Sequence, residues 1–319
     1  MIDLKKINSI IDGSENSLRQ YLTALPPVDQ IGVESRTAML GTRSIKNSSK
    51  NWAIDLAIRM VDLTTLEGSD TPGKIKTLAA KAVRPDATDP TVPCVGAICV
   101  YNDMVKIART ELNSLGGSHV PVAAVSTAFP SGRASIEVKI RDTKDAIEAG
   151  ASEIDMVIDR GAFLSGDLGK VFAEIKTIRE VCGQRAHLKV ILETGELVTL
   201  DNVRKASYLA MLAGADFIKT STGKIAPAAT APVVYVMLEA VRDFYLISGQ
   251  RIGVKPAGGI RTTKDAMKQL VLVNEVAGPE WLNPNLFRIG ASALLNDLLM
   301  QRMKMRDGYY SSPNYVTID

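Results

Sequence analysis

The chain has 319 residues, of which 46% are hydrophobic and 23% charged, so it is not a disordered protein and forms one large domain or two smaller ones. Its 38 basic and 35 acidic residues give a net charge of +3, with no basic run longer than two residues, which excludes a typical nucleic-acid-binding surface. No stretch approaches the roughly 18 apolar residues of a membrane span. Three cysteines and an N-terminus without an apolar leader predict reduced thiols and a cytoplasmic location.

Residues 1–58 are predicted to form an N-terminal extension and not an independent domain. Residues 4–25 have the pattern of one or two surface helices, which Pro26 and Pro27 would end. Residues 31–50 are polar and only weakly periodic, and a helix at 52–59 is expected to lead into the first strand. We expect this extension to cap the main domain or to contact a partner subunit.

From residue 59 to residue 305, short apolar runs alternate with amphipathic helical stretches. The runs are rich in β-branched residues and are bounded by Gly, Pro or polar turns, which is typical of buried parallel strands. We therefore predict strands at 60–66, 94–101, 120–128, 153–158, 188–193, 216–220, 252–257 and 287–290, and helices at 71–82, 102–112, 135–149, 168–182, 200–213, 231–247, 263–276 and 291–303.

Eight strand–helix units over about 240 residues match the usual size of a (β/α)8 barrel. An open, doubly wound sheet is the alternative, but the units are regular and no G-x-G-x-x-G follows the first strand. The predicted fold class is α/β, a (β/α)8 TIM barrel at 59–305, with a helical extension at 1–58 and a C-terminal tail at 306–319.

Active-site groups of such a barrel come from the C-terminal ends of the strands. Four ionisable residues in the apolar runs are candidates for such groups: Asp62, Asp155, Lys219 and Lys255. A buried charge is costly unless it is paired. For Asp62, a structural ion pair and a functional role are equally good explanations of a charge in an apolar run. Two lysines at matching depth on neighbouring strands are harder to explain as structure alone.

Lys219 and Lys255 are expected to point into the barrel mouth from strands six and seven, about 4.8 Å apart. Their mutual repulsion and partial burial should lower the pKa of at least one amine. A neutral lysine is the nucleophile that forms a Schiff base with a carbonyl, and an inward-facing Asp155 is suited to relay protons. The sequence therefore predicts lysine-based carbonyl chemistry.

A metal or a Ser-His-Asp mechanism is not expected. The chain has two histidines, His119 and His187, which lie far apart in the sequence, and it has no Cys-x-x-Cys or His-x-x-x-His. A catalytic zinc usually takes three protein ligands. We predict an enzyme without metal or pyridoxal phosphate.

Glycine-containing loops follow the last three strands, at 221–224, 258–261 and 290–292. Phosphate sites of barrels commonly form from the loops after strands seven and eight and a helix N-terminus. A single Gly-Gly is usually only a turn, but loops at these places, with Lys224 and Arg261 as sources of charge, favour a phosphate cradle.

Six segments resemble those of a known family: Asp62-Leu-Thr-Thr-Leu, Ala97-Ile-Cys-Val-Tyr, Glu153-Ile-Asp, Lys219-Thr-Ser-Thr-Gly-Lys, Val254-Lys-Pro-Ala-Gly-Gly-Ile-Arg-Thr and Phe287-Arg-Ile-Gly-Ala-Ser. In register from about residue 58 to residue 300, they resemble the 2-deoxyribose-5-phosphate aldolases, a family of class I aldolases. The resemblance implies that Lys219 forms the Schiff base, that Lys255 perturbs this amine and that Asp155 joins the proton relay. It also implies that the substrate phosphate is contacted by Gly223, Lys224, Gly258, Gly259, Gly290 and Ser292, with Arg261 beside them.

Further residues of the pocket are predicted less directly: Asp62, Thr64, Cys99 and Thr220. Cys99 matches a cysteine of the family. We expect it to act as a small apolar residue of the interior and not in catalysis. Some members use a tyrosine at the extreme C-terminus, where this chain has none, and no role is assigned to Tyr309, Tyr310 or Tyr315.

The resemblance implies reversible cleavage of 2-deoxyribose 5-phosphate to glyceraldehyde 3-phosphate and acetaldehyde, in deoxyribose phosphate catabolism. We expect a homo-oligomer, a dimer or tetramer, whose ligand is a sugar phosphate and which binds neither nucleic acid nor membrane. Two alternatives remain. One is a barrel lyase or transaldolase-like enzyme with a different aldehyde donor. The other is a non-catalytic barrel that binds sugar phosphates, which the intact Lys219, Lys255 and Asp155 make less attractive.

Overall fold

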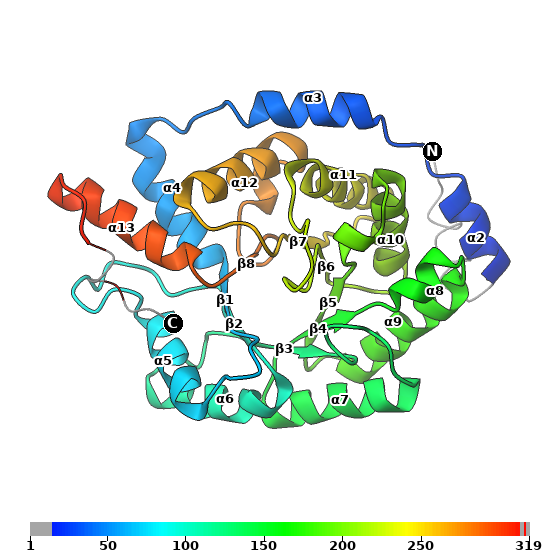
Figure 1. The fold of residues 1–319 in the computed structure, drawn as a ribbon, viewed down its shortest axis with the longest axis horizontal. Helices are drawn as coiled ribbons and strands as arrows, with labels where there is room; N and C mark the ends of the chain where they lie inside the picture. Colours follow the sequence, from blue (N-terminus) through cyan, green and yellow to red (C-terminus); the bar gives the residue numbers. More distant parts are fainter. Residues whose placement is uncertain (1–14, 313–315, 317–319) are drawn as a thin grey trace.

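The computed structural model describes residues 15–312 and residue 316. Eight parallel strands occupy the centre and helices surround them (Figure 1). Each of the eight strands overlaps the apolar run that predicts it and is shorter than that run. They are β1 (Val61–Thr64), β2 (Ala97–Val100), β3 (Val122–Ser126), β4 (Glu153–Val157), β5 (His187–Ile191), β6 (Phe217–Lys219), β7 (Gly253–Lys255) and β8 (Ile289–Ala291).

The strands form a nearly closed barrel. Each of β1 to β6 pairs with its successor in the chain, and β8 pairs with β1. Between β7 and β8, parallel bridges join Val254 to Phe287 and Ala257 to Gly290. The Val254 amide donates to the Leu286 carbonyl at 2.9 Å. The predicted (β/α)8 barrel is therefore confirmed, and the open doubly wound sheet is wrong.

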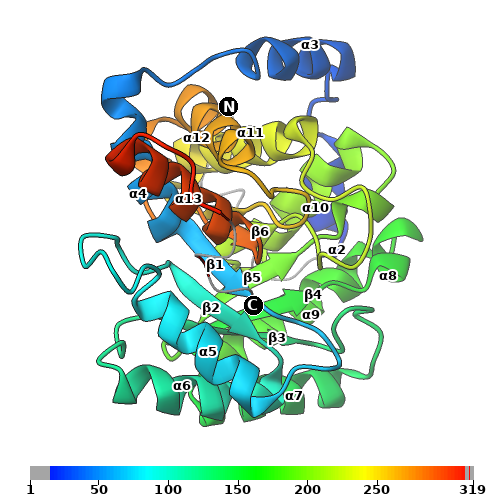
Figure 2. The ribbon, with the colours of Figure 1, turned by 60° about the vertical axis from the view of Figure 1, so that its left-hand side comes forward.

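Helices follow the strands as predicted and cover the outside of the barrel (Figure 2). Their starts and ends follow local chemistry: Thr262 and Asp265 form a capping box at one N-terminus, and Gly150 ends another helix with φ +110°. The helices are α5 (Pro72–Val83), α6 (Val105–Ser114), α7 (Ile136–Ala149), α9 (Leu168–Cys182), α10 (Leu200–Leu212), α11 (Ala231–Ser248), α12 (Thr263–Val276) and α13 (Leu294–Asp307). The helix predicted at 102–112 begins with a 3-10 turn at Asn102–Met104, and the structure adds α8 (Arg160–Leu164) and 3-10 turns at Thr194–Glu196 and Pro279–Trp281.

The residues before β1 form three helices on the outside of the barrel, α2 (Glu15–Thr23), α3 (Gln30–Leu40) and α4 (Asn47–Met60). Figure 1 shows α3 lying across α11 and α12, whereas α2 packs near α9 and α10. The contacts are partly polar: the Val28 amide donates to Asp201 at 2.7 Å, and Arg36 donates to the Tyr235 hydroxyl at 3.1 Å. Residues 4–14 of the predicted N-terminal helices lie outside the described residues.

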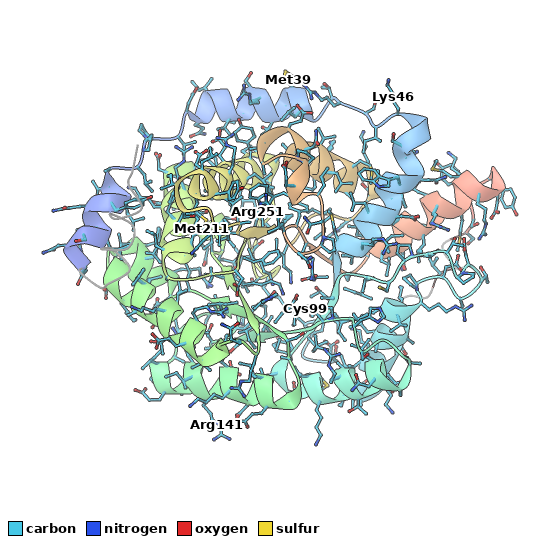
Figure 3. All side chains as sticks on the ribbon, turned by 180° about the vertical axis from the view of Figure 1, so that it is seen from behind. Met39, Lys46, Cys99, Arg141, Met211 and Arg251 are labelled. Carbon is cyan, nitrogen blue, oxygen red and sulfur yellow. The ribbon has the colours of Figure 1, made fainter. Side chains whose placement is uncertain are left out.

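One large apolar cluster fills the space between the strands and the helices. Seen from behind, Met39, Lys46 and Arg141 lie at the periphery, whereas Cys99 lies toward the middle (Figure 3). A second, small apolar cluster of Leu66, Cys99, Ala123 and Val125 lies apart from the first. Asp62, Asp155, Lys189 and Lys255 are fully buried, so charged side chains are part of the protein interior.

Candidate active site

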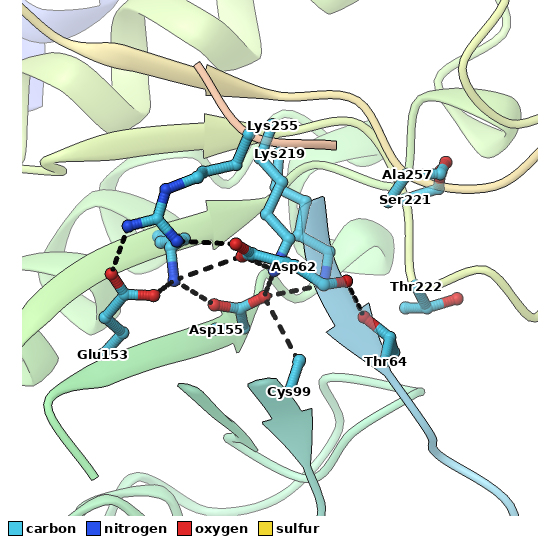
Figure 4. Close-up of polar contacts among 12 residues, drawn as sticks. Asp62, Thr64, Cys99, Glu153, Asp155, Lys219, Ser221, Thr222, Lys255 and Ala257 are labelled. Atoms are coloured by element: carbon cyan, nitrogen blue, oxygen red, sulfur yellow. Dashed lines mark hydrogen bonds and ion pairs between the residues drawn. The ribbon is translucent and has the colours of Figure 1, made fainter. Parts of the chain in front are cut away.

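The carboxylate of Asp155 lies between three lysines. Lys219 Nζ and Lys255 Nζ each lie 2.8 Å from Asp155 Oδ2, and Lys189 Nζ lies 3.1 Å from Oδ1 (Figure 4). The strand register explains why these side chains lie close together. Lys219 pairs with Lys255 across β6 and β7, and Asp155 pairs with Lys189 across β4 and β5. The structure thus brings together the three residues predicted to be catalytic.

Neighbouring charges shift the pKa values of Asp155 and Lys255 in opposite directions. Burial would raise the pKa of the Asp155 carboxyl, but the charges of the three lysines outweigh burial and hold that pKa well below its usual range. Burial would likewise lower the pKa of Lys255, but Asp155 and Asp62 raise it well above its usual value. The lowered pKa that the sequence predicts for at least one amine is therefore not found at Lys255, because two carboxylates outweigh its burial.

A second set of ion pairs lies beside this cluster. Asp62 Oδ2 lies 2.6 Å from Lys255 Nζ, and Asp62 Oδ1 lies 2.6 Å from a guanidinium nitrogen of Arg288. Arg288 also reaches Glu153 at 3.1 Å, and Glu153 contacts Lys189. Asp62 is thus a paired residue within the network, and its pKa is lowered because Lys255, Arg288 and Lys189 outweigh its burial.

The sequence interpretation missed Lys189, Glu153 and Arg288. The signal was present, because Lys189 and Arg288 are charged residues within apolar runs, the same criterion that selected Lys219 and Lys255. All three are nearly or fully buried. They complete a network of opposite charges, without which Asp62 and Asp155 would be costly to bury.

A cavity of about 400 Å³ opens at the C-terminal ends of β1, β6, β7 and β8. Lys219 lines it, whereas Lys255 and Asp155 do not, so Lys219 is the cluster's amine that faces the cavity. Thr64 lines it as well and donates to the Asp62 carbonyl at 2.7 Å. All seven residues predicted to bind phosphate are in the wall: Gly223, Lys224, Gly258, Gly259, Arg261, Gly290 and Ser292.

The glycines of this wall serve two different needs. Gly223 and Gly259 have φ of +82° and +86° with no heavy atom within 4 Å of an added Cβ, so they are required by backbone conformation and leave open space. Gly290 is required by close approach: an added Cβ would lie 2.9 Å from Ala257 Cβ and 3.3 Å from Lys255 Cε. The absence of side chains at Gly223 and Gly259 therefore leaves the cavity open, and the absence of one at Gly290 leaves room for the side chain of Lys255.

Two other predicted pocket residues are buried and do not line the cavity. The Thr220 hydroxyl donates to the Ala257 carbonyl at 3.1 Å and accepts from the Ala257 amide at 2.9 Å, so Thr220 joins the ends of β6 and β7. Cys99 Sγ lies 3.9 Å from Asp155 Oδ2, and burial raises the pKa of its thiol. Beside them, Glu193 accepts from the amide and hydroxyl of Thr222 and so holds the loop after β6, a contact that the sequence did not indicate.

Other features bear on the expected chemistry and setting. Among residues 15–312 and 316, no group of three or more His, Cys, Asp or Glu side chains is arranged to hold a metal ion. Within the same residues, none of the helices is both long and apolar enough to cross a membrane. Tyr309 and Tyr310 are exposed at the end of α13, where the Tyr310 ring covers Lys304 Nζ at 3.7 Å from the ring centroid, and Tyr315 lies outside the described residues.

A (β/α)8 barrel with a lysine in a glycine-lined cavity at the strand ends has the architecture of a barrel enzyme. The model of the DeoC/LacD family aldolases matches residues 56–299, and the chain belongs to this family. It is accordingly an enzyme, a carbon–carbon lyase of the aldolase type.

Several relatives that match most of the chain are named deoxyribose-phosphate aldolases. It is 46% identical over 278 residues to the human deoxyribose-phosphate aldolase and 44% identical over 278 residues to the mouse one, covering 85% of this chain and 87% of each relative. A solved Coccidioides immitis structure, provisionally assigned as a deoxyribose-phosphate aldolase, has 29% identity and a TM-score of 0.63 over 84% of this chain and 97% of its own. The Aeropyrum pernix deoxyribose phosphate aldolase, described as a tetramer, shares the fold with 23% identity and a TM-score of 0.59 over 83% of this chain and 100% of its own.

Proposed function

We propose that this protein reversibly cleaves 2-deoxyribose 5-phosphate to glyceraldehyde 3-phosphate and acetaldehyde through a Schiff base on Lys219. The observation that carries the proposal is the position of Lys219, which lines the same cavity as the glycine loops and contacts Asp155 at 2.8 Å. The names of the relatives at 44–46% identity support the choice of substrate.

The choice of nucleophile follows from access and charge. Lys255 lies outside the cavity wall, and its raised pKa keeps it protonated between two carboxylates. A protonated amine has no lone pair for attack on a carbonyl, so Lys255 supplies charge and protons. Lys219 has one carboxylate partner and faces the cavity, which makes it the amine that a substrate reaches.

The proposed chemistry balances within these residues. The neutral Lys219 amine adds to the C1 aldehyde of the open-chain sugar, and loss of water gives an iminium ion. The C2–C3 bond then breaks as the C3 hydroxyl loses its proton, so that C3 to C5 leave as glyceraldehyde 3-phosphate, and the electron pair of the broken bond moves into the iminium to give an enamine. Protonation at C2 and hydrolysis release acetaldehyde. Asp155, between Lys219 and Lys255, is positioned to pass these protons.

The glycine loops after β6, β7 and β8 are the proposed phosphate site. Their amides can approach an oxyanion closely because glycine has no side chain, and Lys224 and Arg261 add positive charge. A substrate whose phosphate lies here extends its aldehyde end toward Lys219 in the same cavity. No metal or other cofactor takes part in this proposal.

The experiment is borohydride trapping with 2-deoxyribose 5-phosphate, followed by peptide mass mapping. We expect borohydride to reduce an imine on the peptide that contains Lys219. The adduct should carry either the five carbons of the sugar phosphate or the two carbons of acetaldehyde. An adduct on another lysine would contradict the assignment of the nucleophile. Absence of both cleavage and an adduct would favour a non-catalytic sugar-phosphate-binding barrel, and cleavage of a different donor only would favour another lyase.

The proposal extends to setting and assembly. We propose a cytoplasmic catabolic enzyme, which the three free cysteines support. We further propose that residues 1–58 form an extension to the barrel at 59–305, followed by a tail at 306–319, and that the extension contacts a second copy in a dimer or tetramer. The side chains of Ile31, Met39 and Trp52 support this contact, because they are large, apolar and exposed on α3 and α4. Light scattering on the purified protein measures the assembly.

A further inference from the structure

The cavity wall contains an ion pair that the catalytic proposal does not use. Glu67 lies in the loop between β1 and α5, and Lys224 lies in the loop after β6. Their side chains meet across the cavity, with Lys224 Nζ 2.9 Å from Glu67 Oε1. Besides the nucleophile Lys219, the wall contains the basic residues Lys74, Lys224 and Arg261, and among the described lining residues Glu67 is the one with a carboxylate.

Glu67 is held in this place by its own loop. The Glu67 amide donates to Asp70 Oδ2 at 3.0 Å, and the Thr65 hydroxyl donates to Asp70 Oδ1 at 2.7 Å. Lys74 Nζ lies 2.8 Å from the same carboxylate, which joins the loop to the first turn of α5. Asp70 therefore fixes the backbone of the loop, and Glu67 presents its carboxylate to Lys224.

The ion pair between Lys224 and Glu67 is weak enough for another anion to replace Glu67. The side chains of Lys224 and Glu67 are 32% and 61% exposed, in contrast to the fully buried pair of Lys255 and Asp62. Exposed ion pairs are weak because water screens them. A phosphate monoester carries close to two negative charges at neutral pH, so it attracts Lys224 more strongly than a carboxylate does.

We propose that Glu67 is a specificity-determining residue, a counterion that occupies Lys224 until the phosphate of a substrate displaces it. The inference rests on the proposed phosphate site. An incoming anion must release Lys224 from Glu67 and must also bear the repulsion of the freed carboxylate. A weakly charged anion gains too little from Lys224 to do so. Glu67 thereby lowers the affinity of the cavity for anions in general and restricts it to strongly charged substrates.

The test is Glu67→Gln, which removes the charge and keeps the shape of the side chain. We expect the KM for 2-deoxyribose 5-phosphate and the Ki of inorganic phosphate each to fall about two- to fivefold, the range of an exposed ion pair. The kcat/KM for unphosphorylated 2-deoxyribose should stay unchanged, since this substrate places no anion beside Lys224. The matched control is Glu275→Gln, which removes one charge from an exposed pair with Arg43 elsewhere and should alter none of these constants.

Repeating the Glu67→Gln substitution in a Lys224→Met variant shows whether its effect on phosphate binding depends on Lys224. In the Lys224→Met variant, Glu67→Gln should change the Ki of inorganic phosphate much less than it does in the wild type. An increase of KM in Glu67→Gln would overturn the proposal, because it would mean that Glu67 holds Lys224 ready for the substrate. An equal effect in both backgrounds would overturn it too. Calorimetric titration with inorganic phosphate tests the same pair without turnover, so a failure of the proposed cleavage reaction is distinguishable from a failure of this inference.

Discussion

Lys219 and Lys255 share a single acceptor atom, because the Nζ of each lies 2.8 Å from Oδ2 of Asp155. The two amines differ in their other carboxylate contacts and in their access to the cavity. Lys255 has a second carboxylate, Asp62, at 2.6 Å and lies outside the cavity wall, whereas Lys219 faces the cavity. One oxygen therefore links an amine suited to attack with an ammonium suited to hold charge, and substitution should separate the two roles.

We expect Lys219→Ala to abolish borohydride trapping, and Lys255→Met to slow turnover by about 10²–10⁴-fold while still permitting trapping at Lys219. Methionine keeps the length of the buried stem and removes the charge. Loss of that charge leaves Asp62 and Asp155 less compensated, so proton transfer through Asp155 suffers while the nucleophile remains. Mass mapping of the reduced adduct and steady-state kinetics measure the two effects. A label on Lys255, or trapping that persists in Lys219→Ala, would reverse the roles.

Asp155→Asn should lower the free energy of unfolding by about 3–5 kcal/mol at pH 7, because it leaves buried positive charges without their carboxylate. Urea denaturation measures this change. The control Asp145→Asn removes an exposed partner of Arg141 and should cost less than about 1 kcal/mol. An equal effect of the two substitutions would show that the buried cluster contributes no more than a surface pair.

The acid dependence of stability should follow the same carboxylates. The folded-state pKa values of Asp62 and Asp155 are lowered, so their contribution is fully present above the unfolded value of about 3.9 and is lost as the pH falls from there through the folded pKa. The free energy of unfolding should therefore fall on acidification, and it should fall less steeply in Asp155→Asn, which lacks one of these groups. Denaturation series between pH 6 and pH 3 test the difference, and parallel slopes would contradict it.

The sequence predicts the strands well because each is a short apolar run bounded by turns, and a barrel follows from their number and regularity. It does not predict α3, where the buried positions Val33, Thr37 and Leu40 include a threonine that interrupts the apolar pattern. It predicts that Lys219, Lys255 and Asp155 converge, because strand ends meet at one face of the barrel. It does not predict that Lys255 lies between two carboxylates, because Asp62 and Asp155 come from strands that are distant from it in the sequence.

Gly290→Ala should lower kcat with little loss of folding. The added Cβ would lie 3.3 Å from Lys255 Cε and 2.9 Å from Ala257 Cβ, so the lysine stem and the end of β7 must shift. Displacement of Lys255 by a few tenths of an ångström weakens its contacts with Asp62 and Asp155. The control is Gly73→Ala in α5, whose new Cβ meets its nearest atom at 3.8 Å and should leave kcat unchanged. Equal kcat in Gly290→Ala and wild type would show that the packing around Lys255 tolerates the methyl group.

Activity should survive prolonged incubation with excess EDTA. The proposed reaction uses the Lys219 amine as its nucleophile, the iminium formed from it as its electron sink and Asp155 as its proton relay, so chelation removes no participant. The measurement is the rate of aldehyde release before and after dialysis against the chelator. Loss of activity that zinc restores would overturn the lysine-based mechanism.

Gly259→Glu should raise the KM for 2-deoxyribose 5-phosphate steeply, by tenfold or more on the scale of about 1.4 kcal/mol per factor of ten. An added Cβ at Gly259 meets no atom within 4 Å, so the new carboxylate has room to enter the space proposed for the phosphate and repels it there. The backbone φ of +86° adds strain that any side chain would cause, and Gly259→Ala measures this strain without the charge. Unphosphorylated 2-deoxyribose has no anion to repel, so its kcat/KM should fall no further in Gly259→Glu than in Gly259→Ala. Equal losses for the two substrates in Gly259→Glu would mean that this loop does not hold the phosphate.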